Sequence, residues 1–167
     1  MIEKCYPKYC VKSIYELDES FYISNGIKAV IFDIDNTLVT HDTPTPPVEL
    51  LDYFAKLSQW GIKYAIASNN KRSRVETFCC NLGVPYIHRA LKPLKRPLKR
   101  LQRYFGTDAG SVCLVGDQLF TDIFGANRMG FVSVLVTAVG EDETGFVSFK
   151  RVFERMLMKQ YNKSHRE

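Results

Sequence analysis

Short apolar runs alternate with apolar residues at helical spacing along this chain, and this alternation limits the fold more than any other feature. The runs predict strands at 28–32, 62–67, 85–87, 112–115 and 131–136. Helical spacing predicts helices at about 47–61, 73–82, 94–105, 121–129 and 146–160. The first strand has no polar alternation, as expected of a strand that is buried on both faces. The pattern indicates an α/β fold with an open, doubly wound parallel sheet of about five strands.

The length of 167 residues favours a single domain, with its core over about 28–136. We expect the N-terminal segment 1–27 and the basic C-terminal helix 146–160 to pack on that core. No apolar run has the length of a transmembrane helix, and Glu3, Lys4 and Lys8 interrupt the place of a signal peptide's apolar region. The five cysteines form no C-x-x-C pair, which favours free thiols in a reducing cytoplasm.

Polar residues with catalytic potential follow the first two predicted strands. Asp33 and Asp35 come directly after the first strand, so that one carboxylate can attack an electrophile while the other transfers protons. Ser68 and Asn69 follow the second strand, where a hydroxyl and backbone N–H groups can bind an anion. Such residues also form turns and helix caps in proteins without a site there. Neither motif is decisive alone.

Charged residues follow the third and fourth strands in the same way. Lys92 lies just beyond the third strand and can place a positive charge on a phosphate oxygen. Six further Lys and Arg residues crowd 89–103 without one acid, so most of them are expected to form a solvated basic face. Asp117 follows the fourth strand, and Asp122 comes at a helix start, where it can also simply complement the helix dipole. Carboxylate oxygens in such a cluster suit Mg²⁺.

The four motifs are expected to meet, because the carboxyl ends of parallel strands lie at one edge of a sheet. Three or four carboxylates in one crevice repel one another unless a cation offsets them. The sequence therefore predicts a divalent-metal site at this edge.

These residues resemble the motifs of the haloacid dehalogenase (HAD) superfamily of aspartate-nucleophile phosphohydrolases. The matches are DxDxT at 33–37, Ser68, Lys92, and Asp117 with Asp122, in the family's order. The flanking sequences DNTLV at 35–39, ALKP at 90–93 and GDQLFTD at 116–122 are closer to the bacterial YqeG branch. That branch belongs to HAD subfamily IIIA and is similar to phosphatidylglycerophosphatases. The superfamily resemblance covers about residues 28–136 and implies a Rossmann-like HAD fold.

The resemblance implies a mechanism. Asp33 is expected to attack phosphorus and form an aspartyl-phosphate, while Asp35 protonates the leaving alkoxide and later activates water. The residues expected to bind or support the phosphoryl group are Thr37, Ser68, Asn69 and Lys92. The residues expected to bind Mg²⁺ are Asp33, Asp35 through its backbone carbonyl, Asp117 and Asp122. Thr37 is also expected to orient its loop.

The site is expected to be open, because only one predicted helix separates the first strand from the second, and the second from the third. No cap domain fits in either place. An open site suits a bulky or membrane-held substrate, and the resemblance implies phosphatidylglycerophosphate as one substrate class. A small soluble phosphomonoester, such as a nucleotide or sugar phosphate, is the alternative.

The basic residues of the predicted helices 94–105 and 146–160 do not by themselves identify a binding partner. Basic residues beside the leucines of helix 94–105, and those of the last helix, fit peripheral contact with an anionic membrane, but they equally fit amphipathic helices packed on a sheet. We expect a cytoplasmic enzyme, with peripheral contact at the inner face of the membrane as an option. An oligomer is a further option, and no nucleic-acid partner is expected. The net charge of +5 keeps a non-catalytic basic adaptor as an alternative. A receiver-like phosphoacceptor module is disfavoured, because Asp33 and Asp35 both follow the first strand.

Overall fold

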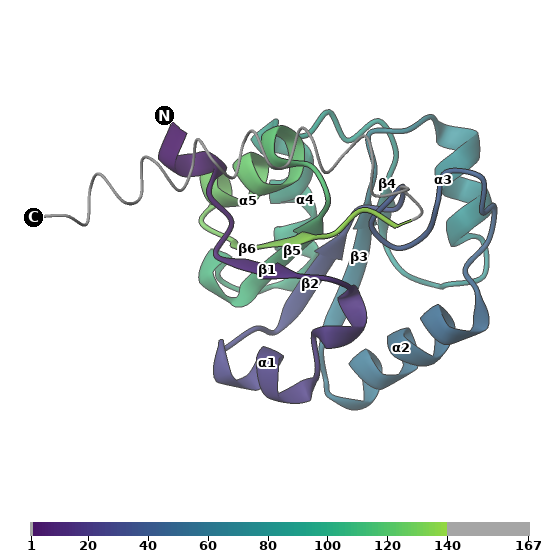
Figure 1. Cartoon of the computed structure of the whole chain (residues 1–167), viewed down its shortest axis with the longest axis horizontal. Helices are drawn as coiled ribbons and strands as arrows, with labels where there is room; N and C mark the ends of the chain where they lie inside the picture. Colours follow the sequence, from purple (N-terminus) through teal and green to yellow (C-terminus); the bar gives the residue numbers. More distant parts are fainter. Residues whose placement is uncertain (1, 140–167) are drawn as a thin grey trace, which may run out of the picture.

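The computed structural model describes residues 2–139, which form one parallel sheet flanked by helices (Figure 1). The strands are β1 (Tyr9–Val11), β2 (Ala29–Phe32), β3 (Lys63–Ala67), β4 (Tyr86–Ile87), β5 (Val112–Gly116) and β6 (Val132–Val136). The α-helices are α1 (Glu19–Ser24), α2 (Val48–Gln59), α3 (Arg72–Cys79), α4 (Lys95–Phe105) and α5 (Phe124–Met129). The short helices are η1 (Ile2–Cys5), η2 (Ile14–Glu16), η3 (Ala109–Ser111) and the π-helix η4 (Leu119–Ile123). The predicted last helix over 146–160 lies outside the described residues.

The strand order β1-β6-β5-β2-β3-β4 places β2 at the centre of the sheet. β2 pairs with β3 on one side and with β5 on the other, and all pairs are parallel. The chain moves in opposite directions from β2, first to β3 and later to β5. Ligands of open α/β sheets bind at the carboxyl ends of the strands where the order reverses in this way. Residues that directly follow β2 and β5 therefore lie at the expected ligand-binding position.

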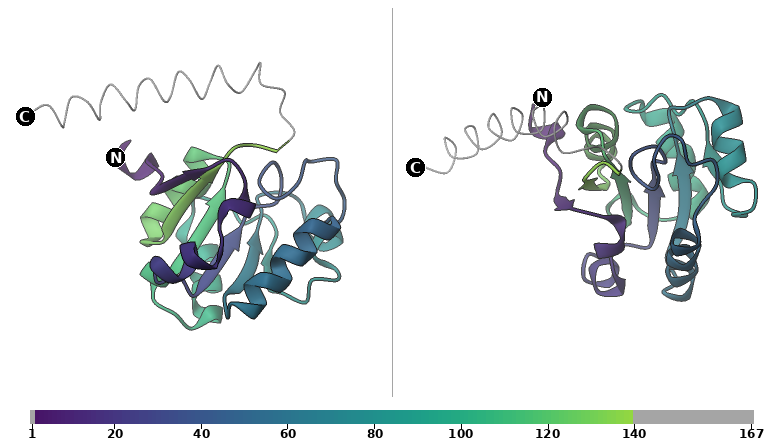
Figure 2. Two further views of the ribbon diagram at one scale, coloured as in Figure 1. Left: turned by 60° about the horizontal axis from the view of Figure 1, so that its bottom comes forward. Right: turned by 45° about the vertical axis from the view of Figure 1, so that its right-hand side comes forward.

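The two faces of the sheet carry separate apolar cores, because successive strand residues point to opposite faces. On one face, Val30 and Phe32 pack in a cluster with residues of α1, α2 and α3. On the other face, Ala29 and Ile31 pack with residues of α4 and α5. Figure 2 (left) shows α1 and α2 in front of the sheet. The strands are thus buried on both faces, as the first apolar run predicted.

The structure confirms the predicted fold class and adds a sixth strand. β1 was not predicted as a strand because it has three residues, of which Cys10 is exposed. This segment becomes a strand because it pairs with β6, with Tyr9 opposite Val134. The predicted helix over 121–129 is observed as η4 followed by α5, and the other elements differ from their predicted bounds by a few residues.

Between β2 and β4 the chain forms only loops, α2, β3 and α3, so no cap domain is inserted there. Across residues 2–139, none of the helices combines the length and apolar composition needed to cross a bilayer.

Candidate active site

A polar cleft of about 280 Å³ opens at the carboxyl edge of the sheet. Its lining residues are Asp33, Asp35, Asn36, His41, Ser68, Asn69, Asn70, Lys92, Gln118, Thr121 and Asp122. Six of the residues predicted for the site are in this lining. The other two, Thr37 and Asp117, are buried directly behind it. The edge therefore gathers all the predicted site residues, from segments up to 89 residues apart in the chain, Asp33 to Asp122.

The centre of the cleft is an ion-pair group of one lysine and two aspartates. The Nζ atom of Lys92 donates a hydrogen bond of 2.6 Å to Oδ1 of Asp33. It lies 2.6 Å from Oδ1 of Asp122 as well, as an ion pair without hydrogen-bond geometry. Desolvation acts to lower the pKa of Lys92, but the charges of Asp122 and Asp33 raise it above the ordinary value. The Lys92 ammonium is therefore a permanent positive charge in the cleft.

The backbone around Lys92 is fixed by the segment that follows β3. The side chain of Asn69 accepts a hydrogen bond from the Lys92 N–H (2.8 Å) and donates one to the Lys92 carbonyl oxygen (3.2 Å). The Ala90 N–H donates to the Ser68 carbonyl oxygen. Asn69 thus positions Lys92, and its predicted contact with phosphate stays a prediction. The hydroxyl of Ser68 accepts from the Asn70 N–H and faces the cleft.

Gly116 and Asp117 shape the acidic side of the cleft at the end of β5. A Cβ atom at Gly116 would lie 2.3 Å from Cγ of Asp122, so only glycine lets Asp122 approach this strand end. Oδ2 of Asp122 accepts a hydrogen bond from the Gln118 N–H (3.1 Å). The Thr37 hydroxyl donates to Oδ1 of Asp117 (3.2 Å). Thr37 therefore links the loop after β2 to the acidic cluster, and its predicted role in orienting that loop stays a prediction.

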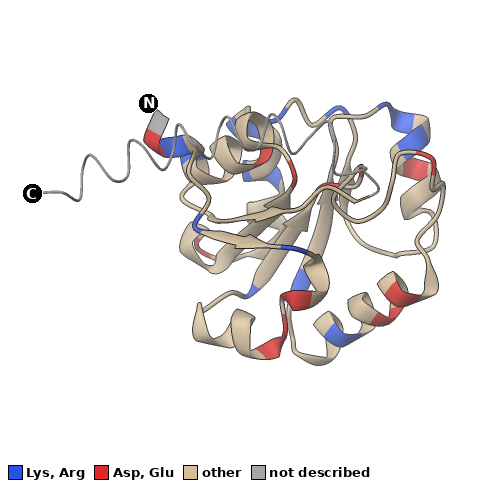
Figure 3. Ribbon diagram, viewed as in Figure 1, with Lys and Arg blue, Asp and Glu red and all other residues tan. Residues whose placement is uncertain are grey.

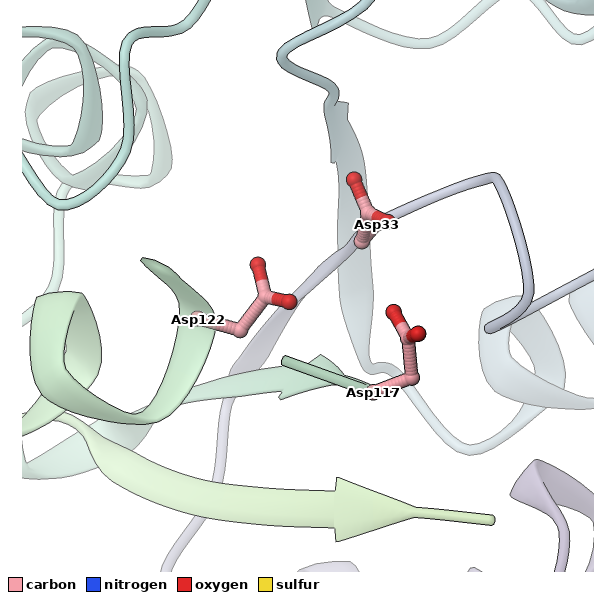
Figure 4. Close-up of side chains that lie close together, drawn as sticks. All are labelled: Asp33, Asp117 and Asp122. Atoms are coloured by element: carbon pink, nitrogen blue, oxygen red, sulfur yellow. The ribbon is translucent and has the colours of Figure 1, made fainter. Parts of the chain in front are cut away.

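Three buried carboxylates form a group that fits a metal ion. Asp33, Asp117 and Asp122 offer oxygen atoms that all lie within 4.8 Å of one another, and Figure 4 shows the three side chains around one space. Lys92 balances only one of the three charges. Oδ1 of Asp122 is buried, and among residues 2–139 it has the Lys92 ammonium as an ion-pair partner but no bond with hydrogen-bond geometry. A hard divalent cation would complete this oxygen donor set and offset the remaining two charges.

Burial and mutual repulsion raise the pKa values of carboxyl groups in this cluster. Burial raises the pKa of Asp33 to about 7 despite the opposing charge of Lys92, and the negative charges of Asp122 and Asp117 add to the effect. Burial and the charge of Asp122 raise the pKa of Asp117 to about 6. Without a metal, these carboxylates therefore hold protons more strongly than ordinary aspartates do.

Asp35 also lines the cleft, but it is not part of the three-carboxylate group. Its Oδ1 accepts hydrogen bonds from Nε (3.1 Å) and Nη2 (3.0 Å) of Arg74, and its Oδ2 accepts one from the side chain of Asn70 (3.0 Å). Nδ1 of His41 lies 3.5 Å from Oδ1. The Asp35 carboxyl is thereby held toward the cleft. Its predicted contribution to metal binding, a backbone carbonyl, stays a prediction.

Three residues beside Asp35, namely Arg74, Asn70 and His41, were not predicted as site residues from the sequence. The side chain of His41 is 67% exposed, and it borders the cleft beside Asp35. Arg74 lies in α3 with no motif around it, so no local signal distinguished it from the other basic residues. Asn70 was visible as part of the polar sequence after the second predicted strand.

Comparisons with known proteins find phosphatases among the proteins that this chain resembles. Residues 2–139 match the family model described as mitochondrial PGP phosphatase. The probable phosphatase YqeG of Bacillus subtilis (strain 168) is 34% identical over 159 residues, which cover 95% of this chain and 92% of that protein. Phosphatidylglycerophosphate phosphatase 1, chloroplastic/mitochondrial, of Arabidopsis thaliana is 26% identical over 166 residues, which cover 93% of this chain and 47% of that protein. The chain thus spans about half the length of this plant relative.

A solved structure shows the same fold. A HAD family enzyme from Bacteroides thetaiotaomicron, in complex with magnesium and inorganic phosphate, superposes with a TM-score of 0.55 at 15% identity. The match covers 72% of this chain and 98% of that one. At this identity the likeness concerns the fold alone.

Proposed function

This chain belongs to the mitochondrial PGP phosphatase family and is a phosphoric monoester hydrolase with the HAD fold, and we propose from this premise that Asp33 is its nucleophile. The observation that carries the proposal is the meeting of Asp33, Ser68, Lys92 and Asp122 in one cleft. A carboxylate beside a fixed cation is suited to attack a phosphoryl group, since phosphoryl transfer depends on positioning and charge stabilisation.

In the first step, an Asp33 carboxylate oxygen attacks phosphorus, and the bond from phosphorus to the substrate's ester oxygen breaks. The leaving alkoxide takes a proton from the Asp35 carboxyl, which Arg74 and Asn70 hold toward the cleft. The product of this step is an aspartyl-phosphate on Asp33 and a free alcohol.

In the second step, the Asp35 carboxylate accepts a proton from a water molecule, whose oxygen attacks phosphorus. The bond from phosphorus to the Asp33 oxygen breaks, which releases inorganic phosphate and restores the carboxylate. Lys92 and the Ser68 hydroxyl bind the phosphoryl oxygens in both steps, because they line the cleft beside Asp33. Asn69 keeps the Lys92 backbone in place throughout.

We further propose that the metal is Mg²⁺, held by Asp33, Asp117 and Asp122, with the Asp35 backbone carbonyl as a fourth ligand. The support is the three-carboxylate group with its two unbalanced charges. The chemistry that Mg²⁺ supplies there is neutralisation of negative charge on the phosphoryl group and the nucleophile. Ca²⁺ has different geometric demands, since it takes more ligands at longer distances.

The substrate we propose is phosphatidylglycerophosphate, the compound for which the plant relative is named. An uncapped cleft supports this choice, because a phosphate on a lipid headgroup can reach it without leaving the bilayer. The chain would then act peripherally on the inner face of a membrane. Small soluble phosphomonoesters are the alternative substrates.

Asp33→Asn tests the nucleophile. Turnover of an aryl phosphate with Mg²⁺ should fall by more than about a thousandfold while the circular dichroism spectrum stays unchanged. Asp108→Asn, which removes an exposed carboxylate at the start of η3, should keep full activity. Undiminished turnover by Asp33→Asn would exclude the nucleophile. Activity on phosphatidylglycerophosphate in mixed micelles, compared with nucleotides and sugar phosphates, tests the substrate.

A further inference from the structure

Exposed apolar side chains are close in the sequence to residues that line the cleft. Leu91 is 61% exposed and Leu94 is 51% exposed, whereas Lys92 between them is buried. The Leu94 N–H donates to the Leu91 carbonyl oxygen (2.9 Å), so the chain turns tightly there. Phe120 is 56% exposed and lies in the sequence between the lining residues Gln118 and Thr121. The turn 91–94 therefore points its lysine into the site and its leucines outward.

The turn 91–94 holds these leucines outward at a conformational cost. Leu91 has a φ of 51°, in the left-handed region that suits glycine or asparagine and is unfavourable for a leucine. The Arg128 guanidinium donates to the Pro93 carbonyl oxygen (3.2 Å), and α5 packs against Pro93 at Gly125. Unfavourable backbone conformations persist where the surrounding structure fixes them, and they cluster at functional sites. An asparagine at position 91 would fold at lower cost, so packing does not explain the leucine.

The surface around the turn is strongly basic. The exposed cations are Arg89, Lys95, Arg96, Lys99 and Arg100. None of them forms an ion pair with any acid in the described range 2–139. In Figure 3, Lys and Arg recur along the top of the view, from the start of α3 across the loop that leads to α4, while the bottom shows acidic residues of α1 and α2 together with some Lys and Arg.

Ordinary packing explains the buried apolar residues of α4 but not the two exposed leucines that precede the helix. Leu98, Leu101 and Phe105 are buried against the sheet, as in any amphipathic helix. Leu91 and Leu94 are on the solvent side instead. Exposed leucines with unpaired cations beside them match the surface of an anionic bilayer, where apolar side chains enter the interface and Lys and Arg approach lipid phosphates.

We propose that the docking surface, formed by the turn 91–94, Phe120 and the first turn of α4, binds an anionic lipid bilayer and holds the cleft against it. The proposal deepens the proposed function, because it states how a lipid phosphate reaches Asp33. Binding itself needs no turnover, so it can be measured separately. The partner is the bilayer surface, and a second copy of the chain or a nucleic acid is a competing outcome.

The test is sedimentation of the full chain with vesicles rich in phosphatidylglycerol and with vesicles of phosphatidylcholine alone. The triple variant Leu94→Gln, Lys95→Gln, Arg96→Gln should bind the anionic vesicles at least about tenfold more weakly than the wild type. The matched control is Ile23→Gln, Lys28→Gln, Lys56→Gln, which also removes one exposed aliphatic side chain and two exposed cations, far from the cleft. The control should bind like the wild type.

A second variant separates docking from folding. Leu91→Asn should leave the free energy of unfolding unchanged or raise it, because asparagine tolerates the backbone conformation, yet it should weaken vesicle binding severalfold. Both variants should keep their turnover of a soluble aryl phosphate and lose turnover of vesicle-borne phosphatidylglycerophosphate.

The proposal is overturned if the wild type does not prefer anionic vesicles, or if the triple variant and its control bind equally. It is also overturned if the triple variant changes only the oligomeric state or RNA binding. If the wild type docks selectively but hydrolyses no phosphate ester, the proposed function fails and the docking surface stands.

Discussion

Replacing the proposed nucleophile should make the metal-free protein more stable, because burial makes the ionised Asp33 carboxylate unfavourable in the folded state. Burial, opposed by Lys92, raises the pKa of Asp33 from 3.8 to about 7. One pKa unit corresponds to about 1.4 kcal/mol, so ionised Asp33 costs the folded state up to about 4 kcal/mol. The amide that Asp33→Asn introduces would carry no charge, though it would interact less strongly with Lys92. We therefore expect a gain of about 2 to 4 kcal/mol at about pH 8.

The sign of the pH dependence follows from the raised pKa. Below the unfolded-state pKa both states are protonated, and the cost of Asp33 is absent. As the pH rises toward 7, the unfolded state releases its proton first, so the wild type loses stability relative to Asp33→Asn. Above a pH of about 7 the difference is constant. The difference in the free energy of unfolding between Asp33→Asn and the wild type should thus be, at about pH 5, about half or less of its value at about pH 8.

Urea denaturation in the presence of a chelator measures this difference, with Asp108→Asn as the control for loss of an exposed carboxylate. The control should change the free energy of unfolding by less than about 0.5 kcal/mol at either pH. The reasoning would be refuted if Asp33→Asn were no more stable than the wild type at about pH 8. It would also be refuted if the gain in the free energy of unfolding were the same at both pH values.

Three other predictions concern the same cluster. Lys92→Met leaves Asp33 and Asp122 buried without their cation, so the free energy of unfolding in urea should fall by about 3 kcal/mol in chelator. Gly116→Ala places a Cβ atom 2.3 Å from Cγ of Asp122, so the melting temperature should fall and Mg²⁺ should raise it less than in the wild type. Mg²⁺ should raise the wild-type melting temperature more at about pH 8 than at about pH 6, because it must displace protons from carboxylates with pKa values of about 7 (Asp33) and about 6 (Asp117).

Matched controls accompany these predictions. Lys99→Met removes an exposed lysine of α4 and should cost little stability. Gly110→Ala adds a Cβ atom with no neighbour within 4 Å and should keep the response to Mg²⁺. A Lys92→Met protein as stable as Lys99→Met, or a Gly116→Ala protein that responds fully to Mg²⁺, would contradict the geometry of the cluster. An equal Mg²⁺ effect at both pH values would show that no proton is displaced.

The central fold could be predicted because its signals are local. The apolar run before Asp33 predicts a strand buried on both faces, which is observed, and Gly61 and Gly106 end helices with left-handed backbone conformations. Once the strands are parallel, the residues after β2, β3 and β5 must share an edge. The edge strand β1 could not be predicted, because three residues carry too little pattern and β6 supplies the partner.

Some features of the candidate site could likewise be predicted from the sequence, and others could not. The sequence alone determined which chemistry this protein can carry, because residue types at strand ends are fixed by the chain itself: two carboxylates, a hydroxyl, a lysine and an acidic pair. Only the tertiary structure decided what each side chain contacts. It turned Asn69 toward the Lys92 backbone, brought Arg74 from α3 to Asp35, and left Leu91 and Leu94 outside the core. Contacts of that kind depend on distances between distant segments, and those distances exist only once the sheet has formed.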